Sequence, residues 1–260
     1  MISAITPLFH SLLFAQSAII GLTAEEARLE TCLSQARQDP ATAITVASEW
    51  AGEVSGPDAS NPQQCLGYAY MSLLRWQAAE EAFLAARTAR AANDVGARAR
   101  LASMAGNAAL AEERHEAALA DFDLAIADAR SAGNVQLAGE AMSDRARALV
   151  GLDRDDEARA ELERAQVEIP QDAEVWLLSA TLARRQDDLT AAQSQIATAA
   201  RLAPQLPAIG LEAGLIAALS GNDDAARKSW QSVVELAPNT PEALAASDYL
   251  AQLDGAPAGR

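Results

Sequence analysis

The chain has 260 residues, half of them hydrophobic but only 4% aromatic, and its 36 acidic and 20 basic side chains give a formal net charge of −16. A field of this sign repels phosphate backbones and anionic lipid, which argues against nucleic acid as a partner. With only 2 histidines, 2 cysteines and no CxxC motif, the chain is too poor in nitrogen and sulfur ligands for a zinc site. We therefore expect no metal and no cofactor.

Residues 1–22, MISAITPLFHSLLFAQSAIIGL, contain no charged side chain. The apolar run from Leu8 to Ile20 has about the length of a signal-peptide core and is short for a membrane span. Ala15 and Ser17 are small enough for a cleavage site, although no Lys or Arg precedes the run. We expect a signal peptide and a periplasmic or secreted protein with no stable membrane span after processing. The alternative is an apolar N-terminal capping helix on a cytoplasmic protein.

Three prolines recur at a fixed interval in the second half of the chain. Pro170, Pro204 and Pro238 recur every 34 residues, and each follows a similar approach, VEIP, RLAP or ELAP. Alanine is frequent and favours helices, while the alternating pattern of strands is absent. The interval therefore predicts an all-α fold made of repeated helix pairs.

The repeating units, which start at residues 139, 173 and 207, place small and large side chains on one helical face. Position 20 of each unit is alanine, and a large apolar residue follows four positions later. Position 8, on the first helix, is glycine or alanine, which lets the two backbones approach closely. Because one pair cannot bury its face alone, stacking of pairs is expected to complete the core. Positions 8, 20 and 24 are Gly67, Ala79 and Phe83; Gly106, Ala118 and Phe122; Ala146, Ala158 and Leu162; Ala180, Ala192 and Ile196; Gly214, Ala226 and Trp230.

Two units upstream of these are longer. Ala79 and Ala118 are 39 residues apart, and Ala118 and Ala158 are 40 residues apart. The extra residues follow Ala86 and Ala125. We expect them to lengthen the second helix of each unit by about one to two turns, ended by Asn-Asp or Gly-Asn.

A 34-residue helix–turn–helix unit with these small and large positions and proline at position 32 resembles the tetratricopeptide repeat (TPR). Trp176 at position 4 and Tyr70 at position 11 match aromatic residues often found in that family. The resemblance implies a right-handed superhelical solenoid over residues 23–254, followed by a disordered tail at 255–260. Its expected parts are a degenerate repeat at 24–57, repeats at 60–95, 99–135, 139–172, 173–206 and 207–240, and a C-terminal capping helix at 241–253.

The resemblance also implies binding, with a protein or peptide partner held in a concave groove lined by the first helices. Arginines in this groove could bind a carboxylate of an acidic or C-terminal peptide. However, Ser103 and Ser143 replace the lysines of the family's carboxylate clamp, and the arginines could instead pair with neighbouring Glu and Asp side chains. An apolar row near the C-terminus could bind a partner or be covered by the capping helix. The candidate groove residues are Tyr68, Arg100, Asn107, Arg147, Thr181, Arg184, Arg185, Leu211 and Leu215.

The two cysteines, Cys32 and Cys65, fall on the first helices of adjacent expected units, and such helices pack side by side. In an exported protein a disulfide between them would close a loop of about 34 residues and stabilise the fold by about 3–4 kcal/mol. In the cytoplasm they would be two core thiols.

No set of residues predicts catalysis. The acidic run from Asp153 to Glu157 lacks the glycine and glutamate of a calcium loop and suits the start of the following helix. His115 has no serine and aspartate arrangement to join. We therefore expect a non-enzymatic interaction scaffold of the bacterial cell envelope. The alternative is an accessory module of an envelope enzyme or of a secretion or assembly complex, docking through its C-terminal apolar face.

Overall fold

The computed structural model describes residues 23–255, so the expected signal peptide at 1–22 and the tail beyond Gly255 lie outside the described residues. Within this range the chain forms 13 α-helices and one short 3₁₀ helix, and it forms no strand. None of these helices combines the length and the apolar character that crossing a membrane requires. The elements are α1 (Ala24–Gln38), α2 (Pro40–Glu53), η1 (Gly56–Ala59), α3 (Ser60–Ser72), α4 (Trp76–Ala89), α5 (Val95–Ala111), α6 (His115–Ser131), α7 (Val135–Gly151), α8 (Asp155–Glu168), α9 (Ala173–Arg185), α10 (Leu189–Leu202), α11 (Pro207–Leu219), α12 (Asp223–Leu236) and α13 (Pro241–Gly255).

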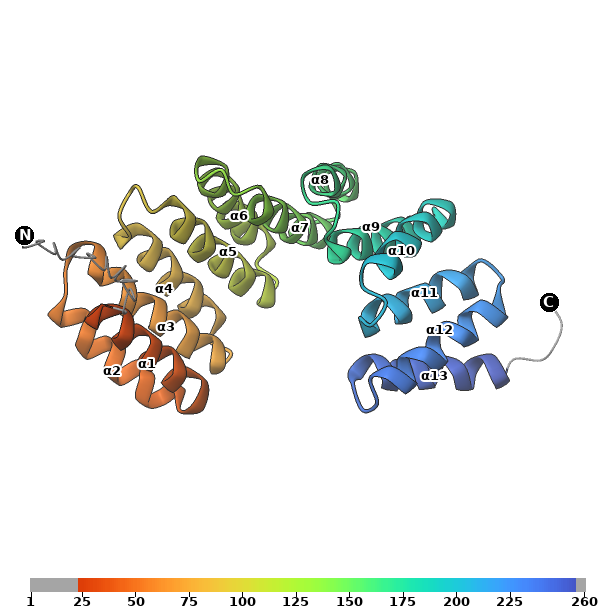
Figure 1. Cartoon of the computed structure of the whole chain (residues 1–260), viewed down its shortest axis with the longest axis horizontal. Helices are drawn as coiled ribbons and strands as arrows, with labels where there is room; N and C mark the ends of the chain where they lie inside the picture. The colour runs from red at the N-terminus through yellow and green to blue at the C-terminus, as the bar shows by residue number, and fades with distance from the viewer. Residues whose placement is uncertain (1–22, 256–260) are drawn as a thin grey trace, which may run out of the picture.

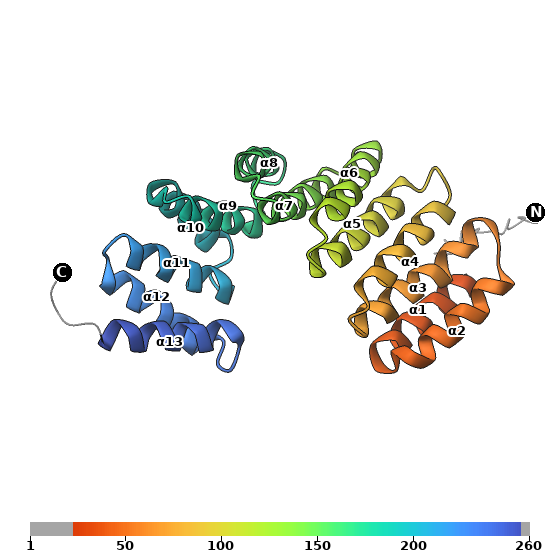
Figure 2. The same cartoon turned by 180° about the vertical axis from the view of Figure 1, so that it is seen from behind.

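Consecutive helices pair, from α1 with α2 to α11 with α12, and α13 packs against α11 and α12. The pairs stack in chain order and form an arch, with the first pair and α13 at the ends of opposite arms (Figure 1). The same arch is seen from behind in Figure 2. The prediction of an all-α solenoid of stacked helix pairs with a C-terminal capping helix is confirmed.

The small and large positions of the repeat hold each pair together. The alanines at position 20 are fully buried in all five units. A Cβ atom built on Gly67 would lie 2.5 Å from Phe83 Cε1, and one built on Gly106 would lie 2.7 Å from Phe122 Cε1. The aromatic ring thus occupies the volume that an alanine side chain would need. Where position 8 is alanine, the facing residue is a leucine or an isoleucine instead.

The turn inside each of the five regular pairs has one backbone form. One residue adopts a left-handed φ between 56° and 75°. Its N–H and the next N–H donate to carbonyl groups of the preceding helix, as Glu113 N does to Leu110 O (3.0 Å) and Arg114 N to Ala109 O (2.9 Å). This Schellman arrangement satisfies carbonyl groups that a helix end would otherwise leave unpaired. The left-handed residues are Leu74, Glu113, Asp153, Asp187 and Gly221.

The three evenly spaced prolines follow the ends of α8, α10 and α12. The residues before them, Ile169, Ala203 and Ala237, have φ between −138° and −128° and are no longer helical. The cause is steric, because a proline ring disfavours the helical conformation of the preceding residue. The Trp176 indole N–H donates to the Pro170 carbonyl (2.9 Å) and so joins the start of α9 to this stop.

The extra residues of the longer units lie partly elsewhere than predicted. α4 has the same 14 residues as α8, α10 and α12, whereas α5, α6 and α7 have 17 each. An extended second helix is therefore correct for α6 and wrong for α4. The reason is capping: Asp94 accepts a hydrogen bond from Ala97 N (3.3 Å) and Asn134 accepts one from Leu137 N (3.0 Å). Both residues begin the next helix and do not end the previous one.

The N-terminal pair departs most from the repeat pattern, yet it packs in the same way. Ala43, Ala47 and Trp50 of α2 are fully buried. The Trp50 indole N–H donates to Glu25 of α1 (3.0 Å), and the Arg28 guanidinium lies over the ring, 4.6 Å from its centroid. This pair therefore covers the first face of the stack.

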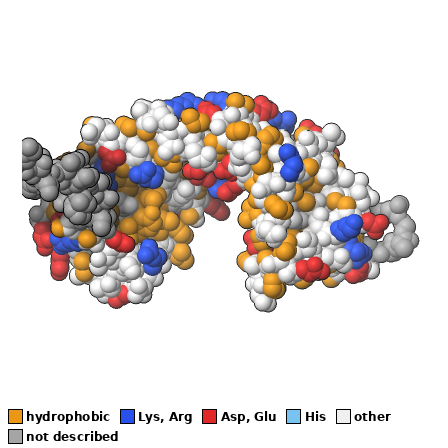
Figure 3. Space-filling view, in the orientation of Figure 1, with side chains coloured by type: hydrophobic (Ala, Val, Ile, Leu, Met, Phe, Trp, Pro, Cys, Tyr) orange, Lys and Arg blue, Asp and Glu red, His pale blue; other side chains and the backbone are white. Residues whose placement is uncertain are grey.

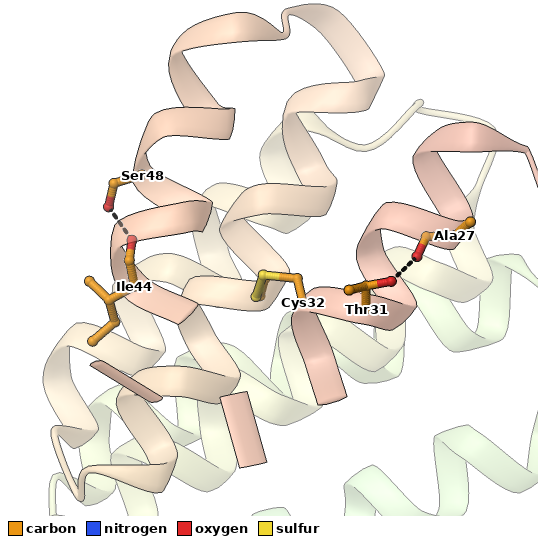
Figure 4. Close-up of a disulfide and its surroundings, with 6 residues drawn as sticks. Ala27, Thr31, Cys32, Ile44 and Ser48 are labelled. Carbon is orange, nitrogen blue, oxygen red and sulfur yellow. Dashed lines mark hydrogen bonds between the residues drawn. A yellow bond between two sulfur atoms is a disulfide. The ribbon is translucent and has the colours of Figure 1, made fainter. Parts of the chain in front are cut away.

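A disulfide joins the first pair to the second. Cys32 of α1 and Cys65 of α3 are bonded, with their Cα atoms 6.0 Å apart, within the usual range for a disulfide. Both cysteines are buried. Figure 4 shows Cys32 on α1 beside the part of α2 that carries Ile44 and Ser48. The export on which a lasting disulfide would depend stays a prediction.

Candidate functional site

The candidate groove residues lie on the first helices of the pairs. At the centre of the arch α7 lies inside α6 and α8 (Figure 1). Figure 3 shows the hollow between the two arms, with hydrophobic side chains on their inner faces and charged side chains of both signs at the top of the hollow. The concave surface is therefore mixed in character, and its chemistry depends on which charges are already paired.

Polar bonds between neighbouring first helices pair several of the predicted residues. Asn107 of α5 donates to Asp144 of α7 (3.3 Å), and Arg147 donates to the same carboxylate (2.8 Å). Burial raises the pKa of Asp144, and the Arg147 guanidinium opposes this shift. Arg147 also pairs with Glu174 of α9. These residues therefore join α5, α7 and α9 to one another.

We call the contact between two successive first helices a seam. The seam between α9 and α11 is joined in the same way. Arg184 of α9 donates to Glu212 of α11 through Nε (2.6 Å) and Nη2 (3.3 Å), and only 9% of the Glu212 side chain is exposed. Of the two alternatives for the arginines, internal pairing is the one that Arg147 and Arg184 adopt. Within residues 23–255, the arginines of the groove therefore do not form a continuous strip of unpaired cations.

A pocket opens between α7 and α9. It has a volume of about 210 Å³ and is closed at its base by Leu162 of α8, which is 2% exposed. Two hydroxyl groups in its wall bond within their own helices, Ser143 to Glu140 O (3.2 Å) and Thr181 to Leu177 O (3.0 Å). The pocket therefore presents mainly apolar surface. Its lining, which we call the α7–α9 pocket, is Ser143, Ala146, Arg147, Val150, Leu162, Leu178, Thr181, Leu182 and Arg185.

Three of the predicted groove residues, Arg147, Thr181 and Arg185, meet in this pocket. Arg185 is exposed, and no carboxylate of residues 23–255 lies within ion-pairing distance of it. Arg147, which also lines the pocket, is held by its two carboxylate partners. The pocket thus combines an apolar interior with one cation that the described chain leaves unpaired.

Arg100 lies apart from this pocket, in a polar recess between α1, α3 and α5 with a volume of about 440 Å³. The lining of this recess includes four carboxylate side chains and also Arg90. Arg100 is therefore surrounded by polar groups of the N-terminal pairs and does not join the arginines of α7 and α9.

Tyr68 fills the seam between α3 and α5. Its ring packs edge-on against Phe83, with centroids 5.4 Å apart, and it contacts the cluster that contains Met71 and Met104. Burial raises the pKa of its hydroxyl. Tyr68 is thus largely a packing residue.

The capping helix covers most of the apolar row of α11. Leu211 and Leu215 pack with Trp230, Tyr249 and Leu250, and they are only partly exposed. The Trp230 ring stacks on Tyr249 at 5.1 Å between centroids. Leu211 and Leu215 therefore contribute to the core beneath α13, as the capping-helix alternative for this row expects, and their part in a partner-binding groove stays a prediction. Of this row, Leu219 stays 58% exposed.

The residues that make the pocket apolar were not among the predicted site residues. Val150 and Leu178 form its walls, and Leu162 was predicted only as core. A signal was present: position 6 of the unit is acidic in Asp144 and Glu212 but apolar in Leu178. Comparison of position 6 across the units could have indicated which two first helices have a pocket between them.

The residues from 23 to 255 contain no group of three or more His, Cys, Asp or Glu side chains arranged to hold a metal ion. His115 packs against Gly151 between α6 and α7, with its Nδ1 buried. It therefore has a place in the packing of these two helices.

Comparisons with known proteins concern the fold. No protein-family model matches the sequence, and no curated protein is significantly similar to it. The structure superposes on PilW, a widely conserved type IV pilus biogenesis factor, with a TM-score of 0.67 and 18% identity over 86% of this chain and 98% of that one. The apo form of RapI gives a TM-score of 0.65 and 12% identity over 89% and 97%. For PilF of Pseudomonas aeruginosa the values are 0.63 and 14% over 88% and 97%.

These similarities extend over nearly the full length of each solved structure. The helix pairs described above and the similarity to PilW and PilF confirm the predicted TPR fold. The protein is therefore a solenoid of the TPR type.

Proposed function

We propose that this protein is a non-enzymatic scaffold that binds a peptide or protein segment in its concave groove, centred on the α7–α9 pocket. The observation that carries the proposal is this pocket of about 210 Å³, which is apolar inside and has arginines at its rim. A concave apolar site with a few polar groups at its edge is the usual form of a ligand site. Binding, and not catalysis, is the activity that these side chains support, since none of them is a nucleophile placed beside a general base.

We extend the proposal to the cell envelope. Residues 1–22 are uncharged and carry a signal-peptide-like apolar run. The Cys32–Cys65 disulfide supports the same compartment, because disulfides persist in oxidising environments. PilW is described as a pilus biogenesis factor, and its similar fold makes an assembly role in the envelope a reasonable hypothesis for this chain.

The groove is favoured over the C-terminal face as the binding surface. α13 covers Leu211 and Leu215, so that face offers less apolar surface than the row on α11 alone would. The α7–α9 pocket has no such cover within the described chain.

Site-specific photo-crosslinking in native cells tests the proposal. A photoreactive residue would replace Arg185 at the pocket rim, Leu219 at the C-terminal face, or Val167 of α8, which is 81% exposed and outside the pocket lining. We expect a discrete adduct from position 185 and none from position 167. An adduct from position 219 alone would support the docking alternative. Equal labelling from all positions, or none from position 185, would contradict groove binding.

The compartment is tested separately by thiol labelling. Native protein is denatured with an alkylating agent and without reductant, and its mass is measured. We expect no alkylated cysteine, because an exported chain would keep the Cys32–Cys65 bond. Two alkylated thiols in a cytoplasmic fraction would contradict the envelope proposal and would leave groove binding intact.

A further inference from the structure

We propose that the α7–α9 pocket binds one apolar side chain of a peptide in which an acidic residue lies next to that side chain. This inference rests on the proposed function and specifies the chemistry of the partner. It follows from a comparison of the seams between successive first helices.

The seams differ in the residue at position 6 of the later of the two units. In the α5–α7 seam this residue is Asp144, which accepts hydrogen bonds from Asn107 and Arg147. In the α9–α11 seam it is Glu212, which pairs with Arg184 at 2.6 Å. A carboxylate and its donors therefore span both of these seams.

The α7–α9 seam has Leu178 at the same position. No carboxylate is therefore present at position 6 of this seam. Arg147 pairs with Asp144 on its own helix and joins α7 to α9 through Glu174, which lies at position 2, nearer the start of α9. The space that an ion pair occupies in the neighbouring seams is open here and is lined by Val150 and Leu178.

A further seam shows what fills an apolar space of this kind. Between α3 and α5, position 6 is Met104, and the Tyr68 ring packs into that seam from the preceding helix. The residue of α7 equivalent to Tyr68 is Arg147, which points to its carboxylate partners. The α7–α9 pocket thus lacks the internal aromatic residue that closes the α3–α5 seam.

An apolar side chain is the group that this pocket favours. Burial of apolar surface contributes about 25 cal/mol per Å². A polar group would find few partners, because the Ser143 and Thr181 hydroxyl groups already donate to backbone carbonyls. An unpaired polar group in such a place costs about 1–3 kcal/mol.

The charge at the rim selects the neighbouring residue of the partner. The pocket lining contains two arginines and no carboxylate, and Arg185 has no ion-pair partner among residues 23–255. A carboxylate next to the bound apolar side chain can accept from the Arg185 guanidinium. The chain's net charge of −16 opposes this only weakly, because charges more than about 8 Å away are largely screened at physiological salt. A lysine at that place in the partner would instead be repelled by Arg185.

A random heptapeptide display library selected on the folded protein tests the inference. We expect wild-type protein to enrich peptides with an apolar residue beside Asp or Glu. The Leu178→Glu variant restores the acidic residue of the neighbouring seams, and we expect it to enrich none of these peptides. Circular dichroism checks that the variant keeps its helices.

Binding of one enriched peptide, made synthetically, then measures the two parts of the site. We expect Leu178→Glu and Arg185→Glu each to weaken binding by about tenfold or more. We expect the same loss when the apolar residue of the peptide is replaced by Ser. Arg100→Glu is the matched control, since Arg100 is another groove arginine but lies in a different recess. We expect it to change the affinity by less than about twofold.

The outcomes separate this inference from the proposed function. Enriched peptides that lose affinity on Arg100→Glu but not on Leu178→Glu or Arg185→Glu would place binding elsewhere in the groove and overturn the inference alone. Enrichment of basic peptides, or of peptides without an apolar residue, would also overturn it. A library that yields no groove-binding peptide would contradict both.

Discussion

Units that end in proline and units that lack this proline are connected to the next unit in different ways. Where proline follows the second helix, as after α8, α10 and α12, the chain leaves the helix at once and the next unit begins within a few residues. Where it is absent, α5, α6 and α7 are longer. A cluster of charges joins α4, α5 and α6: Asp128 of α6 pairs with Arg87 of α4 (2.7 Å) and with Arg98 of α5 (3.7 Å). The comparison teaches that the small and large positions keep each pair together, while the connections decide how the pairs meet.

Removal of the Asp128 carboxylate, which Arg87 and Arg98 share, would break this cluster of charges and has the largest expected effect. Asp128→Asn leaves Arg87 and Arg98 largely buried without their anion, and we expect a loss of about 2–3 kcal/mol in the free energy of unfolding. Denaturant unfolding measures the loss, and hydrogen exchange should localise it to α4–α6. Asp123→Asn is the control: its side chain is 60% exposed, so loss of its pair with Arg145 should cost less than about 1 kcal/mol. Equal losses for the two variants would contradict this account.

A pH titration sharpens the comparison at position 23 of the repeat unit, which lies on the second helix of the pair. Burial, and then the nearby Glu80 carboxyl, raise the pKa of Asp121 to about 7. Between the ordinary pKa of 3.8 and this raised pKa, the folded state binds a proton that the unfolded state has lost, so this stabilisation is full only below the ordinary pKa and is lost as the pH rises through about 7.

The variant Asp121→Asn removes this titration. We expect the free energy of unfolding of the wild type to fall, relative to the variant, by on the order of 2 kcal/mol between pH 4 and pH 8. The corresponding residue in α10 is the neutral Gln195, so Gln195→Ala should show no change of slope over this range. Parallel pH curves for wild type and Asp121→Asn would show that the carboxyl titrates normally.

The match between glycine and an aromatic ring can be broken within one pair. Gly106→Ala places a Cβ atom 2.7 Å from Phe122 Cε1, and we expect a loss of about 1–2 kcal/mol. The same change made together with Phe122→Leu should be nearly neutral relative to Phe122→Leu alone, because Ala146 and Leu162 form that combination in the next unit. A double-mutant cycle by thermal unfolding measures the coupling. Additive effects would contradict it.

The smallest expected effect concerns the turns. Leu74 has φ of 56°, where a side chain is strained, while the equivalent residue of the last unit is Gly221 with φ of 75°. We expect Leu74→Gly to raise the free energy of unfolding by about 0.5–1 kcal/mol and Gly221→Ala to lower it by a similar amount. Thermal unfolding of both variants checks the opposite signs. Equal signs would indicate that the side chain of Leu74 makes contacts that outweigh its backbone strain.

Some of the candidate site could be predicted and some could not. Arg147 and Thr181 at position 9 and Arg185 at position 13 were placed on one surface because both positions are expected to face the groove, and all three line the α7–α9 pocket. Whether each arginine was free depended on carboxylates one unit away, and these were recognised only as an alternative. For Leu211 and Leu215 both alternatives were left open, because the same apolar row can face a partner or a capping helix and periodicity does not distinguish the two.

The sequence by itself determined the helix pairs, their register and the stop at each 34-residue interval, because these depend on residues close together in the chain. A proline acts on its immediate neighbour, and an alanine, a glycine and an aromatic ring at fixed spacing meet within one pair. Only the tertiary structure decided that α13 covers the leucines of α11. The open α7–α9 pocket likewise depends on side chains that different units bring to one seam, and a local pattern does not specify which of them meet.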